Sequence, residues 1–349
     1  MMTVSTMKAA VLHAPADLRV QDVPVPGCKE DEVLIQVKAA GICGSDLDRV
    51  MVTGTYRFPT IPGHEFSGVI AAIGRNVTKF SPGDRVAVAP ILPCFSCDFC
   101  QQGHYGQCNN YNYLGSRTDG GFAEYVAAPE RNLVRLSDNI SYEHGAMVEP
   151  AAVTLHGVMR AGIKAGDSVA VLGCGALGLF AIQFARILGA TRIIVTDIAE
   201  DKLALAQQVG ATQVINSKTD DAVKAILASG AVDITIETAG VAATQVQALE
   251  VTQKHGKVLY LGTAHADVTI PPHVFEHIIR NELTLLGAWN SFSAPFPGRE
   301  WFAIIDYIQN GSLVMQPLIT HTIKLEDLPI FVKDMKKRVV SYNKVIIKM

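Results

Sequence analysis

The sequence predicts a two-domain α/β protein in which a β-barrel-like domain is combined with a doubly wound parallel sheet. The chain has 349 residues, more than the roughly 250–300 at which one hydrophobic core stops growing. Up to about residue 140 it carries short β-type runs separated by prolines, and from about residue 168 short strands alternate with helical patterns. That alternation is typical of a parallel sheet with helices on both faces.

The N-terminal part contains four runs with the composition of strands, at residues 33–37, 68–73, 85–88 and 122–126. Prolines interrupt the segments around them, at positions 24, 26, 59, 62, 82 and 90. Because proline cannot donate a hydrogen bond to a strand ladder and favours turns, this pattern predicts a compact β-domain with functional loops.

The C-terminal part predicts six strands, at residues 168–172, 192–196, 213–215, 232–236, 257–261 and 283–286. Apolar periodicity between them predicts helices, including 177–188 and 202–209. A further helix at 301–308 and a last strand at 344–348 are expected to return to the first domain. The predicted domains are therefore 1–152 with 290–349, and 153–289.

Composition limits the classes of partner. Hydrophobic residues make up 49% of the chain and charged residues 18%, and the formal net charge is -3. This balance gives no electrostatic reason to expect nucleic acid or an anionic membrane as a partner. No apolar run reaches the ~18 residues of a membrane span, and the N-terminus lacks the charged and apolar regions of a signal peptide. We expect a cytoplasmic protein.

Four cysteines form a dense cluster with the spacing C-x2-C-x2-C-x7-C at Cys94, Cys97, Cys100 and Cys108. Four thiolates this close can surround one tetrahedral Zn2+. Cysteines two residues apart are too cramped to form separate disulfides, which makes a disulfide framework a poor alternative. The loop 94–108 is therefore predicted to bind a structural zinc ion. The use of the seven cysteines fits a reducing compartment.

A glycine fingerprint, Gly173-Cys-Gly175-Ala176-Leu177-Gly178, follows the first predicted strand of the α/β part and opens a helix. In this context the glycines allow a tight turn, approach of a pyrophosphate, and close helix–strand packing. The helix N-terminus offers N–H groups and positive dipole to the phosphates.

Asp197 ends the next strand, where its carboxylate would bind the adenosine ribose and repel a 2'-phosphate. Ile198 follows it in place of an arginine, so NAD is favoured over NADP. Lys202 is a further candidate for a ribose contact, although a solvated lysine on the helix face is an equal alternative. A glycine-rich turn without a ligand is the alternative interpretation of the whole motif.

A third set of residues has ligand chemistry but wide spacing: Cys43, His64 and Glu149. A catalytic zinc ion needs three protein ligands and one open position, and these residue types are suitable. Separations of 21 and 85 residues do not by themselves bring them together. Each residue also has a structural interpretation, as a small buried cysteine, a turn histidine and a helix-start carboxylate.

These segments in this order resemble the zinc-dependent medium-chain dehydrogenase/reductase superfamily, over nearly the whole chain. The likeness is specific, because the Gly63-His64-Glu65 segment, the cysteine loop and residues 120–125 all occur in family order. It implies a GroES-like catalytic domain, a Rossmann domain, and a cleft between them. It also implies that Cys43, His64 and Glu149 hold a catalytic zinc.

The resemblance assigns two further roles near that zinc. Glu65 matches the carboxylate behind the zinc, which in the family is sometimes an alternative ligand, and Ser45 matches the hydroxyl that begins a proton relay. Glu149 stands where ordinary alcohol dehydrogenases usually carry cysteine and where polyol dehydrogenases carry glutamate. The implied activity is therefore zinc-dependent oxidation of a secondary hydroxyl, with hydride transfer to NAD.

The implied substrate is a polyol phosphate similar to galactitol 1-phosphate, which would be oxidised to a ketose phosphate. Its phosphate would need a cationic anchor, for which the candidates are Arg57, Arg117, Arg299 and Lys344. An unphosphorylated polyol (sorbitol, xylitol or arabitol), a threonine-type amino alcohol, and a silent NAD-binding protein of crystallin type are the alternatives. The family usually pairs through the outer sheet edge, here strand 283–286, so a homodimer is expected and a tetramer is the second choice.

Overall fold

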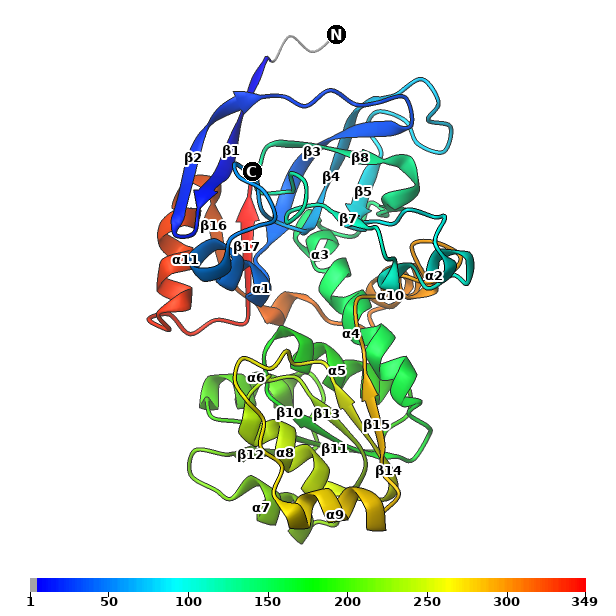
Figure 1. The fold of residues 1–349 in the computed structure, drawn as a ribbon, viewed down its shortest axis with the longest axis vertical. Coiled ribbons are helices and arrows are strands. Elements are labelled where there is room, and N and C mark those ends of the chain that lie inside the picture. Colours follow the sequence, from blue (N-terminus) through cyan, green and yellow to red (C-terminus); the bar gives the residue numbers. More distant parts are fainter. Residues whose placement is uncertain (1–4) are drawn as a thin grey trace. The chain divides into compact units, whose positions relative to one another are not determined.

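The computed structural model describes residues 5–349 and divides them into two compact units (Figure 1). Unit 1 extends to Glu149 and also contains Phe292–Gln309 and Ile319–Met349. Unit 2 contains Pro150–Ser291 and the short segment Asn310–Leu318. The placement of Asn310–Leu318 in unit 2 differs from the predicted division, which assigned all of 290–349 to the first domain. Within residues 5–349, no helix combines the length and apolar character needed to cross a membrane.

Unit 1 is built on a seven-stranded sheet that branches at strand β3. Strand β4 pairs along one edge of β3, from Val33 to Gly41. The opposite edge of β3 is divided, because β8 pairs with its first half and β17 with its last three residues. The sheet contains β3 (Glu32–Gly41), β4 (Glu65–Ile73), β5 (Arg85–Val88), β8 (Tyr125–Pro129), β9 (Leu133–Arg135), β16 (Ile319–Lys324) and β17 (Lys344–Lys348).

This branching brings three distant parts of the chain to the same end of β3. Gly41 pairs with Glu65 of β4 and with Ile346 of β17, and the Ile42 N–H donates to the Val345 carbonyl at 3.0 Å. The loop that follows β3 is therefore fixed beside the beginnings of β4 and β17. Register matters here because a slip of one residue would turn every side chain to the opposite face.

A hairpin and several short elements complete unit 1. The hairpin consists of β1 (Thr6–Ala14) and β2 (Asp17–Pro24). The predicted strand 122–126 begins only at Tyr125, because the backbone before it bonds to β1 instead, through Ala10 N–H and the Phe122 carbonyl. The remaining elements are α1 (Gly44–Asp48), β6 (Ile91–Leu92), α2 (Asp98–Gln101), β7 (Asn112–Tyr113), α3 (Tyr142–Ala146), α10 (Arg299–Gln309) and α11 (Leu328–Lys336).

Unit 2 is a six-stranded parallel sheet, in the order β12-β11-β10-β13-β14-β15. Strand β10 is buried along its whole length, as expected for a strand covered on both faces. Its strands are β10 (Ser168–Leu172), β11 (Arg192–Asp197), β12 (Gln213–Asn216), β13 (Val232–Glu237), β14 (Thr252–Tyr260) and β15 (Thr284–Gly287). Its helices are α4 (Val148–Ala161), which begins in unit 1, α5 (Ala176–Ile187), α6 (Glu200–Gln208), α7 (Ala222–Ala228), α8 (Ala242–Val251) and α9 (Pro272–Arg280).

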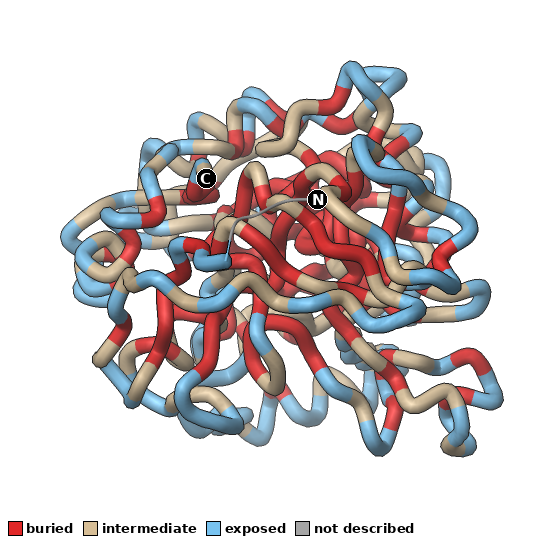
Figure 2. Tube along the Cα trace, turned by 90° about the horizontal axis from the view of Figure 1, so that it is seen from above, coloured by how far each residue is buried: buried red, intermediate tan, exposed pale blue. Residues whose placement is uncertain are grey.

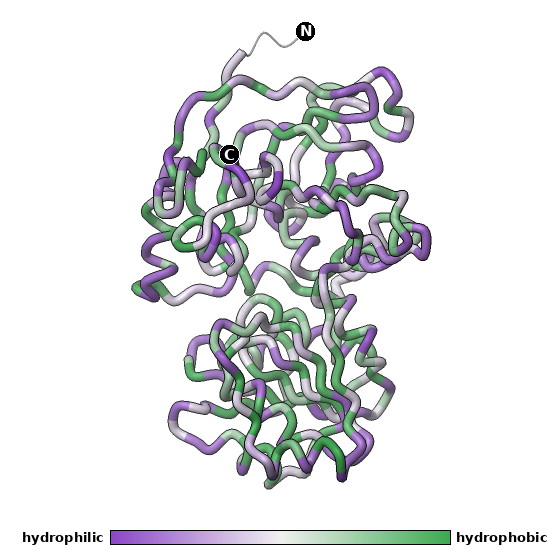
Figure 3. The backbone as a smooth tube through the Cα atoms, in the orientation of Figure 1, coloured by the Kyte–Doolittle hydropathy of each residue, from purple (hydrophilic) through white to green (hydrophobic). Residues whose placement is uncertain are grey.

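All six strands predicted for this part are confirmed, and so are the helix at 301–308 and the last strand. The largest difference is β14, which begins five residues earlier than predicted. Gly256 and the left-handed His255 (φ 59°) interrupt its apolar pattern. Buried residues concentrate in the inner segments of the trace and exposed residues on the outer loops (Figure 2). Hydropathy follows burial in unit 2, where the inner segments are predominantly hydrophobic (Figure 3).

Asp233 fastens the start of the central strand of unit 2. Its Oδ2 accepts hydrogen bonds from the Ser168 N–H at 2.7 Å and from the Ser168 hydroxyl at 2.6 Å. Burial by itself raises the pKa of Asp233, but these hydrogen bonds outweigh it, so that the pKa lies below 3.8. The charged carboxylate therefore stabilises β10 against β13.

We expect Asp233→Asn to lower the free energy of unfolding by about 1–2 kcal/mol at pH 7, because the amide is a weaker acceptor and brings donors of its own. Since the folded pKa lies below the unfolded one, the stabilisation is complete above the unfolded pKa and is lost as pH falls through the folded pKa. Denaturant unfolding at pH 7 and below pH 3.8 measures this difference. Asp267→Asn, at an exposed loop position of the same unit, is the matched control. An equal loss at both pH values would contradict the account.

Candidate functional site

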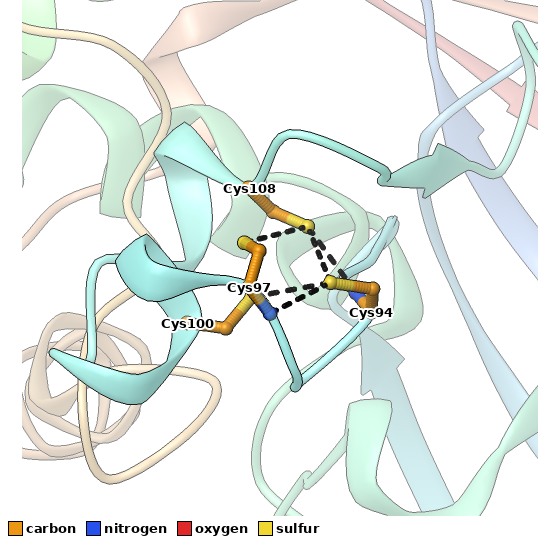
Figure 4. Close-up of side chains that lie close together, drawn as sticks. All are labelled: Cys94, Cys97, Cys100 and Cys108. Carbon is orange, nitrogen blue, oxygen red and sulfur yellow. Dashed lines mark hydrogen bonds between the residues drawn. The ribbon is translucent and has the colours of Figure 1, made fainter.

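The four-cysteine loop has the geometry of a tetrahedral metal site. The four Sγ atoms lie within 4.8 Å of one another, and none of these cysteines is in a disulfide. The Sγ–Sγ distances are 3.4 Å for Cys94–Cys108, 3.9 Å for Cys97–Cys108 and 4.0 Å for Cys94–Cys100 (Figure 4). Zn–S bonds of about 2.3 Å place the corners of a tetrahedron about 3.8 Å apart. The spacing therefore fits a zinc ion.

Local backbone geometry prepares these sulfurs for a cation. Cys97 stands at the N-cap of α2, and its N–H donates to Cys94 Sγ at 3.4 Å, while Cys108 Sγ accepts from the Cys94 N–H at 3.2 Å. Hydrogen bonds from Ser96 and the Cys97 N–H lower the pKa of Cys94 to about 5. Burial and the neighbouring sulfurs raise the pKa of Cys100 to about 12. The site thus favours a thiolate at Cys94 and a neutral thiol at Cys100. A bound cation would favour the thiolate at both, because metal ligation requires thiolates.

A second cluster lies at the end of β3, where ligand atoms of Cys43, His64 and Glu65 are within 4.8 Å of one another. Cys43 is the N-cap of α1, directly after β3, and His64 and Glu65 stand where β4 begins. Gly63 has φ 95° and packs so closely that a Cβ would lie 2.4 Å from the Phe122 ring. Glycine there lets the chain place His64 in the cluster.

Asp46 contacts both His64 and Cys43 and orients them. Its side chain is fully buried, Oδ1 lies 3.2 Å from His64 Nδ1, and Oδ2 accepts from the Cys43 N–H at 3.0 Å. Although burial opposes it, the attraction of His64 holds the pKa of Asp46 below 3.8. With Nδ1 turned to a carboxylate, His64 keeps Nε2 for a metal, the usual arrangement behind a histidine ligand.

Arg49 is a part of this site that the sequence motifs did not reveal. Its Nη1 donates to Ser45 Oγ at 2.9 Å and lies 3.5 Å from Asp46 Oδ1. Ser45 Oγ in turn donates to Cys43 Sγ at 3.3 Å. The signal in the sequence is the spacing, since residues three and four apart share a helix face. Arg49 thus links the hydroxyl of Ser45 with the carboxylate beneath His64.

Glu65 forms a buried ion pair with Lys344 from β17. The two side chains are 1% and 2% exposed, and Lys344 Nζ donates to Glu65 Oε2 and, at 3.3 Å, to the Ile42 carbonyl. Burial by itself lowers the pKa of Lys344. The attraction of Glu65 and Cys43 outweighs this effect, so the net shift of the pKa is upward. The lysine therefore stays charged and is committed to this pair.

Glu149 lies beside the cluster but outside the group of three closest ligands. It occupies the first turn of α4, is buried, and accepts a hydrogen bond at 3.3 Å from Tyr113 OH. Burial raises its pKa to about 7, with His64 lowering it and Glu65 raising it. Tyr113, which the motifs also missed, places its ring edge against His64, with the centroids 5.9 Å apart. The tyrosine thereby contacts two of the predicted ligands.

The glycine fingerprint lies where β10 passes into α5 in unit 2. Gly173 has φ 102°, and a Cβ at Gly178 would stand 2.0 Å from the Gly173 carbonyl oxygen, so only glycine permits this packing. A Cβ at Gly175 would meet nothing within 4 Å. Ala176 and Leu177 begin α5, whose N-terminal N–H groups can bind phosphate. The turn fits the pyrophosphate of a dinucleotide.

Asp197 stands at the carboxyl end of β11, next to this turn. Its Oδ2 accepts from the Cys174 N–H at 2.7 Å and its Oδ1 from the Ala199 N–H at 3.0 Å. These bonds fix the carboxylate beside the fingerprint. Ile198 after it is 63% exposed, and Lys202 lies half-buried in α6. The residues that the motif singled out are thus brought together on one side of the sheet.

Comparison with known families identifies both parts of the chain. Residues 29–138 match the alcohol dehydrogenase GroES-like domain, and residues 176–308 match the zinc-binding dehydrogenase family. The fold and these sites therefore define a zinc-dependent medium-chain dehydrogenase, and this chain belongs to that family. It is an oxidoreductase that acts on a CH–OH group and uses zinc and a nicotinamide dinucleotide.

Several relatives are similar over almost their whole length. Galactitol 1-phosphate 5-dehydrogenase of Escherichia coli K12 is 38% identical over 335 residues, which cover 95% of this chain and 97% of the relative. Sorbitol dehydrogenase of Bacillus subtilis is 36% identical, covering 92% of this chain and 91% of the relative.

Solved structures agree. Galactitol-1-phosphate dehydrogenase from Escherichia coli has a TM-score of 0.93 at 37% identity, covering 98% of this chain and 100% of that chain. A zinc-binding dehydrogenase from Sinorhizobium meliloti bound to NADP has a TM-score of 0.92 at 34% identity, covering 99% and 100%.

The buried pair of Glu65 and Lys344 gives a stability prediction. Lys344→Met leaves a buried carboxylate without its partner, and we expect the free energy of unfolding to fall by about 3–5 kcal/mol. Glu65→Gln combined with Lys344→Met should recover most of this loss, because neither side chain is then charged. Lys8→Met, which removes a surface pair with Asp22, is the control. Denaturant unfolding of the wild type and these three variants measures the effect, and a double variant as unstable as Lys344→Met alone would contradict it.

Proposed function

We propose that this dehydrogenase oxidises a secondary hydroxyl of a polyol phosphate to a ketose phosphate with transfer of a hydride to NAD. The observation that carries the proposal is the buried cluster in unit 1, where a thiol, an imidazole and two glutamates converge. The similarity to galactitol 1-phosphate 5-dehydrogenase over 95% of the chain supports the phosphorylated substrate.

Within this cluster, we assign the catalytic zinc to Cys43, His64 and Glu149. A thiolate, an imidazole nitrogen and a carboxylate form a suitable set for a catalytic zinc with one open position. Glu65 is closer to the other two ligand atoms, but Lys344 already neutralises it. Glu149, by contrast, accepts a hydrogen bond from a phenol and from no other group among residues 5–349, and burial raises its pKa to about 7. The desolvation cost of Glu149 is therefore less compensated than that of Glu65, and a cation would relieve more of it beside Glu149.

The chain's own residues would orient the substrate and move its proton. When bound, zinc supplies Lewis acidity and the nicotinamide ring supplies the hydride acceptor. Ser45 would take the proton of the substrate hydroxyl while passing its own proton toward solvent. A guanidinium offers donors and no acceptor, so Arg49 does not continue the relay; it fixes the direction of the Ser45 hydroxyl.

Asp197 supports NAD rather than NADP as the cofactor. Its carboxylate is held in place by two backbone N–H groups, and the exposed Ile198 beside it offers no positive charge for a 2'-phosphate. The Sinorhizobium meliloti relative was solved with NADP, so the preference rests on these residues of this chain. Lys202 is proposed to contact the ribose.

The second candidate is a dehydrogenase of a free polyol. The 36% identity to sorbitol dehydrogenase of Bacillus subtilis favours it. All of the zinc and dinucleotide assignments would be unchanged, because the two activities differ only in how the distal end of the substrate is bound.

We also propose that the protein is a cytoplasmic homodimer. Strand β15 is the edge of the six-stranded sheet, and an exposed edge invites pairing with another chain. Leu285 in this strand is 44% exposed, and Phe275 and Ile279 in α9 are 54% and 63% exposed. Burial of such apolar side chains would favour association. Size-exclusion chromatography with light scattering would test it, and a monomer would refute it. The seven free cysteines fit a reducing compartment.

A substrate and cofactor panel tests the proposed activity. We expect NADH formation, followed at 340 nm, with kcat/KM for galactitol 1-phosphate at least about tenfold higher than for galactitol, sorbitol, xylitol or threonine, since a bound dianion adds more than about 1.4 kcal/mol. NAD should be preferred to NADP by a similar factor. Equal rates with galactitol and its phosphate would move the protein to the free-polyol branch. A preference for NADP would overturn the assignment of Asp197.

Removal of one thiolate tests the structural zinc. We expect Cys94→Ser to lower the zinc content from two ions per chain to about one and to lower Tm by several degrees, because structural zinc contributes directly to folding. Elemental analysis and thermal unfolding measure both effects. Cys28→Ser, at a half-buried position outside both clusters, should keep two ions. A Cys94→Ser protein with two tightly bound zinc ions would exclude the assignment.

A further inference from the structure

Of the four cations considered as phosphate anchors, two are already neutralised. Arg57 pairs with Asp119 at 2.8 Å, and Lys344 is buried against Glu65. Arg299 is exposed at the start of α10, and no ion pair or ring contact with another residue of 5–349 holds its side chain near the metal cluster. Arg117 differs from all three, because it is held in place and yet has no counter-charge.

The Arg117 guanidinium stacks on two tyrosine rings. Its central carbon lies 3.9 Å from the ring centroid of Tyr56 and 4.5 Å from that of Tyr111. Its Nε is buried without a hydrogen-bond partner, and no carboxylate within residues 5–349 forms an ion pair with it. The stack uses the π-faces of the rings, so the N–H donors of the guanidinium stay available for an acceptor.

The stack is connected directly to the metal cluster of unit 1. The backbone N–H of Arg117 donates to the Tyr113 carbonyl at 3.0 Å, and the rings of Tyr111 and Tyr113 meet edge to face with their centroids 6.4 Å apart. Tyr113 itself contacts His64 and Glu149. A guanidinium that is separated from His64 by two tyrosine rings is placed for the distal end of a substrate whose hydroxyl is at the metal.

We propose that Arg117, which stacks on Tyr56 and Tyr111, binds the phosphate group of the substrate and determines the preference for a phosphorylated polyol. This inference rests on the function proposed above. Guanidinium groups bind phosphate oxygens through two parallel hydrogen bonds. The tyrosine stack fixes the side chain before binding, which reduces the entropy lost on contact. A phosphomonoester dianion supplies a counter-charge for the guanidinium and an acceptor for its unpartnered Nε–H. A neutral hydroxyl has no charge and cannot accept two parallel hydrogen bonds.

Substitution of the cation tests the subsite. For Arg117→Met, we expect kcat/KM for galactitol 1-phosphate to fall roughly 10- to 100-fold more than kcat/KM for galactitol, because a charge-assisted pair is lost for one substrate only. Arg117→Lys should recover only part of the loss, since a lysine cannot form the bidentate pair. Arg135→Met is the matched control, because Arg135 also stacks on an aromatic ring, that of Phe80, but is neutralised by Asp84.

The stack itself provides a second test. Tyr56 is 69% exposed, so Tyr56→Leu is expected to fold normally and still to weaken the preference for the phosphorylated substrate. Inorganic phosphate should inhibit galactitol oxidation competitively in the wild type and at least roughly tenfold more weakly in Arg117→Met.

The outcomes separate the two levels of the argument. A wild-type enzyme without any preference for galactitol 1-phosphate would refute the proposed function itself. A wild-type enzyme with that preference, accompanied by an unchanged preference in both Arg117→Met and Tyr56→Leu, would overturn only the anchor. Zinc content and Tm of each variant show that the compared proteins are folded.

Discussion

Burial of negative charge at the end of β3 is the constraint on which the site of unit 1 depends. Cys43, Asp46, Glu65 and Glu149 converge there, and Asp46 and both glutamates are at most 5% exposed. Lys344 and Arg49 compensate part of this charge. Isolated charges are too costly to bury, so a divalent cation at the proposed zinc site would complete the balance. On that assignment, the metal would stabilise this cluster as well as act in catalysis.

The backbone creates this arrangement through sheet pairing between distant segments. Strand β3 pairs with β4 on one side and with β8 and β17 on the other, so residues near positions 43, 65 and 344 meet at one point. Asp46 and Arg49, on the helical turns after β3, then orient the histidine and the Ser45 hydroxyl. The dinucleotide turn of unit 2 depends on a different constraint, the exclusion of side chains at Gly173 and Gly178.

Local patterns were sufficient to predict the parts of the molecule that are local in the chain. The six parallel strands, the glycine turn and the cysteine loop each lie within a short window, and the structure contains all three. The cluster at the end of β3 is different, because its members extend from Cys43 to Glu149 along the chain, and the ion-pair partner Lys344 lies farther still, so that only the fold brings them together. Tyr113 went unnoticed for that reason, whereas Arg49 follows Ser45 by only four positions but belongs to no motif. Family resemblance added Glu65 to the candidates, but its tighter approach is visible only in the folded chain.

The choice between these two glutamates is the central claim of the account. Crystals of the zinc-loaded protein, measured at the zinc absorption edge, test it directly. The account predicts two anomalous peaks per chain, one among the four cysteines and one bound by Cys43 Sγ, His64 Nε2 and Glu149, with Glu65 still on Lys344. A second peak ligated by Glu65 in place of Glu149, or no peak at all beside Cys43, would contradict it.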